Sequence, residues 1–177
     1  GQLYGLEALR ILSVALPRAV TDGADLKARG RVLWASTVAG LALHNCNTHM
    51  GHNISHALGS LVRIHHGLAT GLGLEVSLPW LVARPEGADN YGLAAQALGG
   101  DAKATALPEA LSRLMRACNI PAALPADCAD VTPAMLAREM KNEANIGMAR
   151  NAACHMTDSN LDEIATLMMG LPKTSAA

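Results

Sequence analysis

The apolar residues of this chain recur mainly at intervals of three and four positions, which is the spacing of one face of a helix. Leu6, Leu9 and Leu16 mark such a face at the start of the chain, and Pro17 is expected to end this first helix. No Ser, Thr, Asp or Asn precedes the helix to cap its first backbone N–H groups. The sequence therefore opens in mid-helix, and we expect further residues upstream of it.

A second helix is predicted from Asp25, whose carboxylate can cap it, through Leu43. Its apolar stripe is expected to contain Leu26, Val32 or Leu33, Val38 and Leu41. Small residues along the same segment, among them Ala35, would let a neighbouring helix approach closely. These two segments predict a helical hairpin joined by the Thr21-Asp22-Gly23 turn.

Later segments continue the helical pattern. An apolar helix is predicted over 68–81 with an interruption at Pro79, a short helix over 91–98 ending at Gly99-Gly100, and further helices from 105, 132 and 158. The segment from Glu143 to His155 is polar and weakly periodic, which favours an irregular link. No segment alternates like a strand and no linker divides the chain, so the sequence predicts one all-α, bundle-like domain over 1–177.

Composition supports closely packed helices and excludes several partners. Half of the residues are apolar and Phe is absent. Fourteen basic residues face fifteen acidic ones without a run of like charge, so nucleic acid is not an expected partner. No apolar stretch approaches the roughly 18 residues of a membrane span, and no secretion signal is visible, so we expect no membrane partner and a cytoplasmic location.

The four cysteines fall at wide, irregular intervals without a CxxC pair. They are Cys46, Cys118, Cys128 and Cys154. Neither a zinc ribbon nor a redox motif has this spacing, so four buried, reduced thiols are expected.

Six of the seven histidines lie between His44 and His66, and they carry the most informative pattern. His52 and His56 are four apart, so on a helix they share one face, which His49 joins. His66 follows His52 by fourteen residues, or about 21 Å along a straight helix, so the chain must reverse between them before both can bind one metal ion. Gly59 and a non-helical stretch over 62–64 would allow this reversal.

The histidines allow two other interpretations. The first is a chance gathering of core and surface histidines, which we favour for His44 and His155 alone. The second is a zinc-peptidase helix, but Asn53 stands where that motif needs a general-base Glu, and Val62 stands at the third histidine of its extended form. Phosphate-cradling GxxxxGK, GxGxxG and GxSxG motifs are also absent, so the chain cannot hold a dinucleotide by itself.

The histidine motif resembles that of the iron-containing alcohol dehydrogenase family, whose C-terminal domain has a histidine, a second one four later, a Leu-Gly, and a His-Gly fourteen after the first. Here these are His52, His56, Leu58-Gly59 and His66-Gly67. The likeness extends to residues 6–8, 16–20 and 35–45. It fades beyond about Leu111.

The resemblance implies a role for each histidine of the motif. His52 and His66 would be ligands of Fe²⁺ or Zn²⁺. His56 would lie beside the metal, contacting the nicotinamide cofactor and relaying a proton to or from a small alcohol or aldehyde. NAD or NADP would be held mainly by an N-terminal nucleotide-binding half that precedes this domain in the family.

Three departures from the family pattern accompany the resemblance. The Asp and His that complete the metal site lie upstream of Gly1 in the family, as does the nucleotide-binding half. His65 replaces the usual proline before the second ligand, and His49 is an additional histidine. We therefore expect the C-terminal catalytic domain of a metal-dependent, NAD(P)-dependent alcohol dehydrogenase or aldehyde reductase, inactive as this fragment alone.

The alternative is a noncatalytic helical domain for metal binding or oligomerisation. A helical half would expose the surface on which its partner half docks. We therefore also expect that this chain can self-associate into a homo-oligomer.

Overall fold

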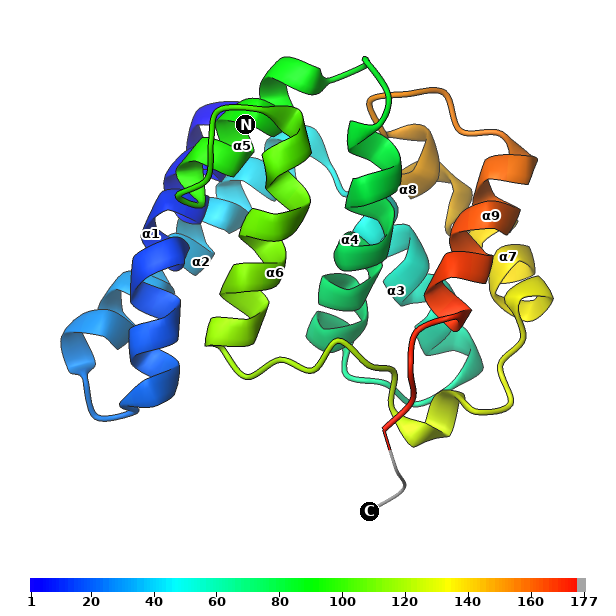
Figure 1. Cartoon of the computed structure of the whole chain (residues 1–177), viewed down its shortest axis with the longest axis horizontal. Coiled ribbons are helices and arrows are strands. Elements are labelled where there is room, and N and C mark those ends of the chain that lie inside the picture. Colours follow the sequence, from blue (N-terminus) through cyan, green and yellow to red (C-terminus); the bar gives the residue numbers. More distant parts are fainter. Residues whose placement is uncertain (175–177) are drawn as a thin grey trace. The chain divides into compact units, whose positions relative to one another are not determined.

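The computed structural model describes residues 1–174 and consists of helices joined by turns and longer loops (Figure 1). The α-helices are α1 (Gln2–Thr21), α2 (Leu26–Cys46), α3 (Met50–Leu61), α4 (His66–Val82), α5 (Ala88–Ala97), α6 (Leu107–Ala117), α7 (Pro133–Lys141), α8 (Ile146–Arg150) and α9 (Asp158–Met169). Two 3-10 helices, η1 (Ala104–Ala106) and η2 (Ala126–Cys128), complete the set. The described residues form no strand, only an isolated bridge between Leu124 and Lys173, so the predicted all-α class is confirmed.

The helices divide into two compact units. Unit 1 contains residues 1–47 and 82–120, and unit 2 contains residues 48–81 and the segment from 121 onward. Each unit combines two separate stretches of chain, so no linker in the sequence marks the division and the sequence analysis did not predict it. The single domain expected over 1–177 stays a prediction, and its residues 175–177 lie outside the described part.

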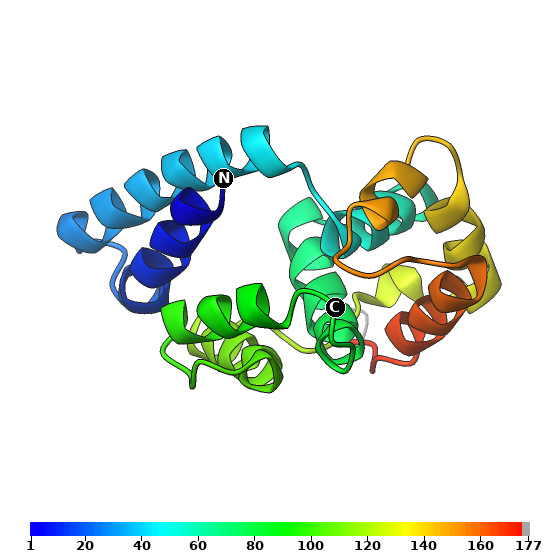
Figure 2. The ribbon, with the colours of Figure 1, turned by 90° about the horizontal axis from the view of Figure 1, so that it is seen from above.

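The antiparallel pair α1 and α2 is the main feature of unit 1 (Figure 2). Asp25 caps α2 as predicted, because its carboxylate accepts a hydrogen bond from the Ala28 backbone N–H at 2.9 Å. The prediction that Pro17 ends the first helix was wrong: α1 continues to Thr21. A proline removes one helical hydrogen bond, and the packing of α1 along α2 outweighs that loss.

The predicted apolar stripe of α2 was right in part. Val38 is buried and Val32 is partly buried against the core as predicted, but Leu26 and Leu41 are exposed. The residues that α2 buries are Ala28, Ala35 and Val38. Ala35 is fully buried against Ile11 and Ala15 of α1. Small side chains let the two backbones approach closely, so the larger leucines of α2 point away from the contact.

The second segment of unit 1 supplies α5, η1 and α6. Gly99 ends the short helix as predicted, since it adopts a φ of 80°, in the left-handed region that favours glycine. The backbone N–H of Gly100 then donates to the Ala95 carbonyl at 2.9 Å, which satisfies a carbonyl at the end of α5. α5 packs against both α1 and α6.

In unit 2, α3 contacts α7 and α8, and α7 packs against α9 (Figure 1). Thr132 caps α7 as predicted, while Thr157 and Asn160 form a capping box at the start of α9. Two predictions were wrong here: α4 continues through Pro79, and the polar segment after Glu143 contains the short helix α8.

Helices α3 and α4 approach each other closely where Gly73 of α4 meets Gly51 of α3. A Cβ atom added at Gly73 of α4 would lie only 3.1 Å from the Gly51 carbonyl of α3, and 3.2 Å from the Ile54 Cβ. Only glycine fits at such a distance without a shift. This contact holds the middle of α4 against the first two turns of α3, the two helices that carry the histidines described below.

Two further expectations concern the cysteines and membranes. Cys118, Cys128 and Cys154 are buried thiols as predicted, but Cys46 is exposed because it lies at the last turn of α2. Over residues 1–174, no helix combines the length and the apolar character that a membrane crossing requires.

Candidate metal centre

The reversal between α3 and α4 brings the histidines of the motif together. α3 begins directly after His49 and ends at Leu61, Val62 is extended, and α4 starts at His66. The chain therefore turns back within four residues, close to where Gly59 and the 62–64 stretch were expected to turn it. All of these residues belong to unit 2.

Three imidazole rings, those of His52, His56 and His66, form what we call the histidine cluster. The ring centroids of His52 and His66 lie 5.4 Å apart, as do those of His56 and His66, and His52 and His56 are separated by 6.2 Å. Two imidazoles that bind one ion through nitrogens about 2.1 Å from it have ring centroids about 5 Å apart at roughly tetrahedral angles. The spacing of His52 and His66 is therefore compatible with a shared metal ion.

The cluster does not form a complete metal site. Among residues 1–174, no group of three or more His, Cys, Asp or Glu side chains is arranged to hold a metal ion. A tetrahedral site needs four donors. This chain thus fits a metal ion through two imidazoles at most, and the remaining donors would have to come from outside it.

Burial and neighbouring charge favour the neutral form of the His52 imidazole. The pKa of His52 lies below the usual value of 6.5, mainly because the ring is partly buried, and also because a charge on His66 or His56 would repel its own. Burial also lowers the pKa of His49. A neutral imidazole offers a lone pair, so His52 can act as a donor at neutral pH.

Two polar residues between the histidines in the sequence are buried behind the cluster. Asn53 is fully buried, and its side-chain amide donates to the carbonyls of Met140 and Asn145, both at 2.9 Å. This residue therefore ties α3 to the last turn of α7 and to the residue that precedes α8. It faces away from the cluster histidines into the core, which agrees with the rejection of a peptidase interpretation.

Ser55 is a residue that the sequence analysis missed. Its hydroxyl oxygen lies 3.0 Å from Nδ1 of His66 and donates to the His66 carbonyl at 3.1 Å. Serine is neither a usual metal ligand nor a group that titrates near neutral pH, so nothing in the sequence marks this serine as part of the site. The one available signal is its position between His52 and His56, directly before His56.

His49 lies directly before α3, where its charge would also lower the pKa of His52, but its ring makes no ring contact with the cluster in the described part of the chain. The other three histidines are exposed. Ring contacts between histidines in the described part of the chain are confined to the three cluster members. His44 is exposed on α2 in unit 1, and His155 is exposed before α9. His65 is exposed too, with its ring beside Gly67.

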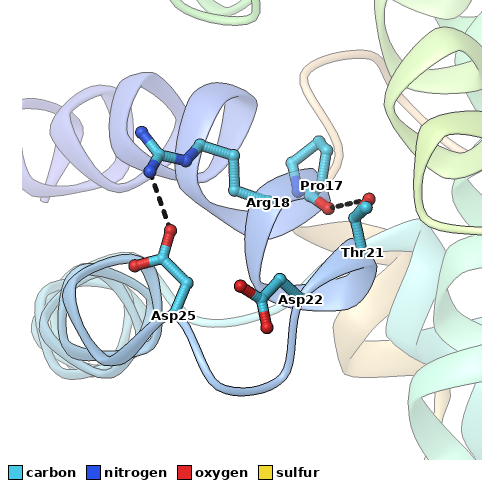
Figure 3. Close-up of a pocket in the computed structure, with 5 residues that line it drawn as sticks. All are labelled: Pro17, Arg18, Thr21, Asp22 and Asp25. Carbon is cyan, nitrogen blue, oxygen red and sulfur yellow. Dashed lines mark hydrogen bonds and ion pairs between the residues drawn. The ribbon is translucent and has the colours of Figure 1, made fainter.

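Unit 1 contains a shallow hollow of about 290 Å³ (Figure 3). It lies at the turn between α1 and α2, where Arg18 donates to Asp25 at 2.7 Å. Asp22 accepts from the Ala24 N–H, and Asp25 also caps α2. The backbone N–H of Ala28 and the Arg18 guanidinium lower the pKa of Asp25. These polar groups stabilise their own turn, so the hollow carries no chemistry.

Comparisons with known proteins agree with the fold and with the family resemblance. The model of the Fe-containing alcohol dehydrogenase family, C-terminal part, matches residues 3–168. The 1,3-propanediol dehydrogenase of Citrobacter freundii is 38% identical over 82 residues, which are 46% of this chain and 21% of that protein. The 1-propanol dehydrogenase PduQ of Citrobacter freundii is 34% identical over 122 residues, which are 65% of this chain and 33% of that protein.

A solved structure shows the same fold. The alcohol dehydrogenase from Oenococcus oeni superposes with a TM-score of 0.76 at 22% identity, covering 90% of this chain and 43% of that one. The chain therefore spans less than half the length of the relatives that it matches.

Proposed function

Since the chain belongs to the Fe-containing alcohol dehydrogenase family and matches its C-terminal part, we propose that it is the helical catalytic part of an NAD(P)-dependent alcohol dehydrogenase or aldehyde reductase. The observation that carries this proposal is the convergence of His52, His56 and His66 at centroid distances of 5.4 to 6.2 Å. The substrates are small alcohols or aldehydes, as the names of the propanediol and propanol relatives suggest.

In this proposal His52 and His66 hold Fe²⁺ or Zn²⁺. The spacing of their rings and the lowered pKa of His52 support the assignment, because a ligand must offer a lone pair. A bound divalent ion would polarise the alcohol oxygen and lower its pKa, which favours the loss of hydride from the neighbouring carbon. The other ligands, an Asp and a His, come from the helix that precedes this part in the family.

His56 is the proposed proton-transfer residue and the contact with the nicotinamide. It is the next residue along the helix face from His52, and its ring is exposed and 5.4 Å from that of His66. An exposed imidazole beside the two proposed ligands can reach a substrate bound next to them. In its neutral form it accepts the proton of the alcohol, and in its protonated form it returns one to an aldehyde.

The nucleotide-binding half is the proposed partner of this chain. No dinucleotide-binding motif stands in the sequence, so hydride transfer requires a second part that holds NAD or NADP. We expect no alcohol oxidation by the 177 residues alone, and turnover once the nucleotide-binding half is joined to them. Appreciable turnover by the chain alone would contradict this division of roles.

The metal assignment is tested by three alanine variants of the chain joined to a nucleotide-binding half. His52→Ala and His66→Ala should each lose tight metal binding and activity, because one donor is removed. His44→Ala should change neither, since His44 is exposed in the other unit. Metal content by mass spectrometry and alcohol oxidation are the measurements. Unchanged metal content in both ligand variants would refute the assignment.

The same experiment tests the alternative function. Metal bound through His52 and His66, without turnover in the joined protein, would identify a noncatalytic metal-binding module. Self-association, which the sequence analysis left open, stays a prediction that sedimentation of the chain can test.

A further inference from the structure

The contacts of Ser55 point to a role in orienting one of the proposed ligands. Ser55 is only 2% exposed, on the side of α3 that faces the start of α4. Its hydroxyl oxygen touches His66 twice, at 3.0 Å from ring nitrogen Nδ1 and at 3.1 Å from the backbone carbonyl oxygen. One buried hydroxyl therefore anchors both the ring and the backbone of the residue that begins α4.

The single hydroxyl hydrogen of Ser55 determines which nitrogen of the His66 ring carries a proton. A serine hydroxyl has one hydrogen, and a carbonyl oxygen can only accept. The hydroxyl that donates to the His66 carbonyl must accept from the ring, which requires a proton on Nδ1. A neutral imidazole protonated on Nδ1 has its lone pair on Nε2.

The His66 carbonyl can accommodate this arrangement. It also accepts a hydrogen bond from the Thr70 hydroxyl at 2.9 Å, and a carbonyl oxygen has two lone pairs. Because Ser55 is buried, water does not compete for its hydroxyl. The Nδ1 edge of the ring is thereby fixed against α3, and the opposite edge, with Nε2, is left for a ligand.

We propose that Ser55 is a positioning residue that holds His66 in the Nδ1–H tautomer, so that Nε2 is its metal-binding atom. This inference deepens the proposed function, since it takes His66 as a metal ligand. Residues that hydrogen-bond the far nitrogen of a liganding histidine fix its tautomer and orientation, and their loss typically lowers metal affinity about 10- to 100-fold.

The first measurement needs no metal. Nitrogen-15 NMR of the imidazoles in the 177-residue chain, with His66 assigned through His66→Gln, reports the tautomer at neutral pH. We expect Nδ1–H in the unsubstituted chain and a shift toward Nε2–H in Ser55→Ala. The matched control is Ser60→Ala on the same helix, whose hydroxyl donates to the Ala57 carbonyl at 2.8 Å; it should leave the tautomer unchanged.

The second measurement is a calorimetric titration with Zn²⁺ of the same three chains, each joined to a nucleotide-binding half, because the remaining metal donors lie outside this chain. Ser55→Ala should bind about 10- to 100-fold more weakly, and Ser60→Ala as tightly as the unsubstituted chain. A His66 ring in the Nε2–H form in the unsubstituted chain would overturn the proposal, even if Ser55→Ala failed to fold. Equal Zn²⁺ affinity in a folded Ser55→Ala would overturn it as well.

The two measurements also separate this inference from the proposed function. If His66 has the expected tautomer and loses it in Ser55→Ala, but neither joined protein binds Zn²⁺, the metal role fails while the orienting contact stands. If Zn²⁺ binds and depends on His52 and His66 but not on Ser55, the metal role stands and the positioning role fails.

Discussion

The two units differ in what they bury and in what they expose. The largest fully buried side chains of the described residues all lie in unit 2; they include Met50, Ile54, Leu58, Leu72, Leu136, Met140, Leu161 and Met168. The exposed large apolar side chains of the same residues lie in unit 1 with the single exception of Leu167. They are Leu3, Tyr4, Val14, Val20, Leu26, Leu33, Trp34, Leu41, Leu43 and Leu93.

This difference follows from the kind of contact in each unit. The main contact of unit 1 buries small residues such as Ala15 and Ala35, and many of the large side chains of α1 and α2 remain outside. Unit 2 packs large side chains inward, and the histidine cluster lies on helices that supply this core. Ligands held on a rigid element keep their geometry. The candidate chemistry therefore lies on the unit whose core contains the largest fully buried side chains.

The contrast between the two units is tested most directly by replacing one leucine in each unit with alanine. Leu136→Ala in α7 should lower the free energy of unfolding by about 2 to 5 kcal/mol, because the side chain is fully buried and leaves a cavity. Leu33→Ala in α2, where the side chain is 71% exposed, should change it by less than about 0.5 kcal/mol. Urea unfolding followed by circular dichroism measures both, and equal losses would contradict the contrast.

A second variant tests the buried polar contact of unit 2. Asn53→Ala removes the amide that binds the Met140 and Asn145 carbonyls, and should lower the free energy of unfolding by about 1 to 3 kcal/mol because buried acceptors lose their donor. Asn45→Ala is the control, since the Asn45 amide binds the Leu41 carbonyl on an exposed surface. Thermal unfolding of the two variants is compared, and a smaller loss for Asn53→Ala would argue against its role.

A third variant tests the small-residue contact of unit 1. Ala35→Leu should overfill the space against Ile11 and Ala15 and cost about 1 to 3 kcal/mol in the free energy of unfolding. Ser36→Leu, at the exposed next position of α2, should cost far less. If urea unfolding showed that Ala35→Leu is tolerated as well as Ser36→Leu, the close contact of α1 and α2 would not be a determinant of stability.

The smallest expected effect is a dependence of stability on pH from His49 in unit 2. Burial lowers the pKa of His49 below 6.5 in the folded chain, so the unfolded chain binds the proton first as the pH falls. This contribution to stability is complete above about pH 6.5 and is lost progressively below it. Melting temperatures between pH 8 and pH 5 should therefore fall less steeply in His49→Gln.

The exposed histidine of unit 1 supplies the control for this pH dependence. His44→Gln should keep the profile of the unsubstituted chain, because the His44 side chain is exposed. Identical profiles for His49→Gln and the unsubstituted chain would show that burial of His49 does not couple its protonation to folding.

Several parts of the fold and the site could be predicted from the sequence because their signals are local. The caps at Asp25 and Thr132, the helix end at Gly99 and the turn before His66 all depend on residues within a few positions. The interruptions expected at Pro17 and Pro79 were wrong, because helix packing over the whole length outweighs one missing hydrogen bond.

The sequence by itself determined the all-helical class, the family and the pair of histidines fourteen residues apart, since periodicity and spacing are properties of the chain alone. Tertiary structure decided which face of α2 is buried, how two discontinuous segments form each unit, and that Ser55 touches His66. Those features depend on contacts between residues far from one another along the chain or on different helices. Local spacing cannot specify them, because the same pattern of apolar and polar residues is compatible with several packings.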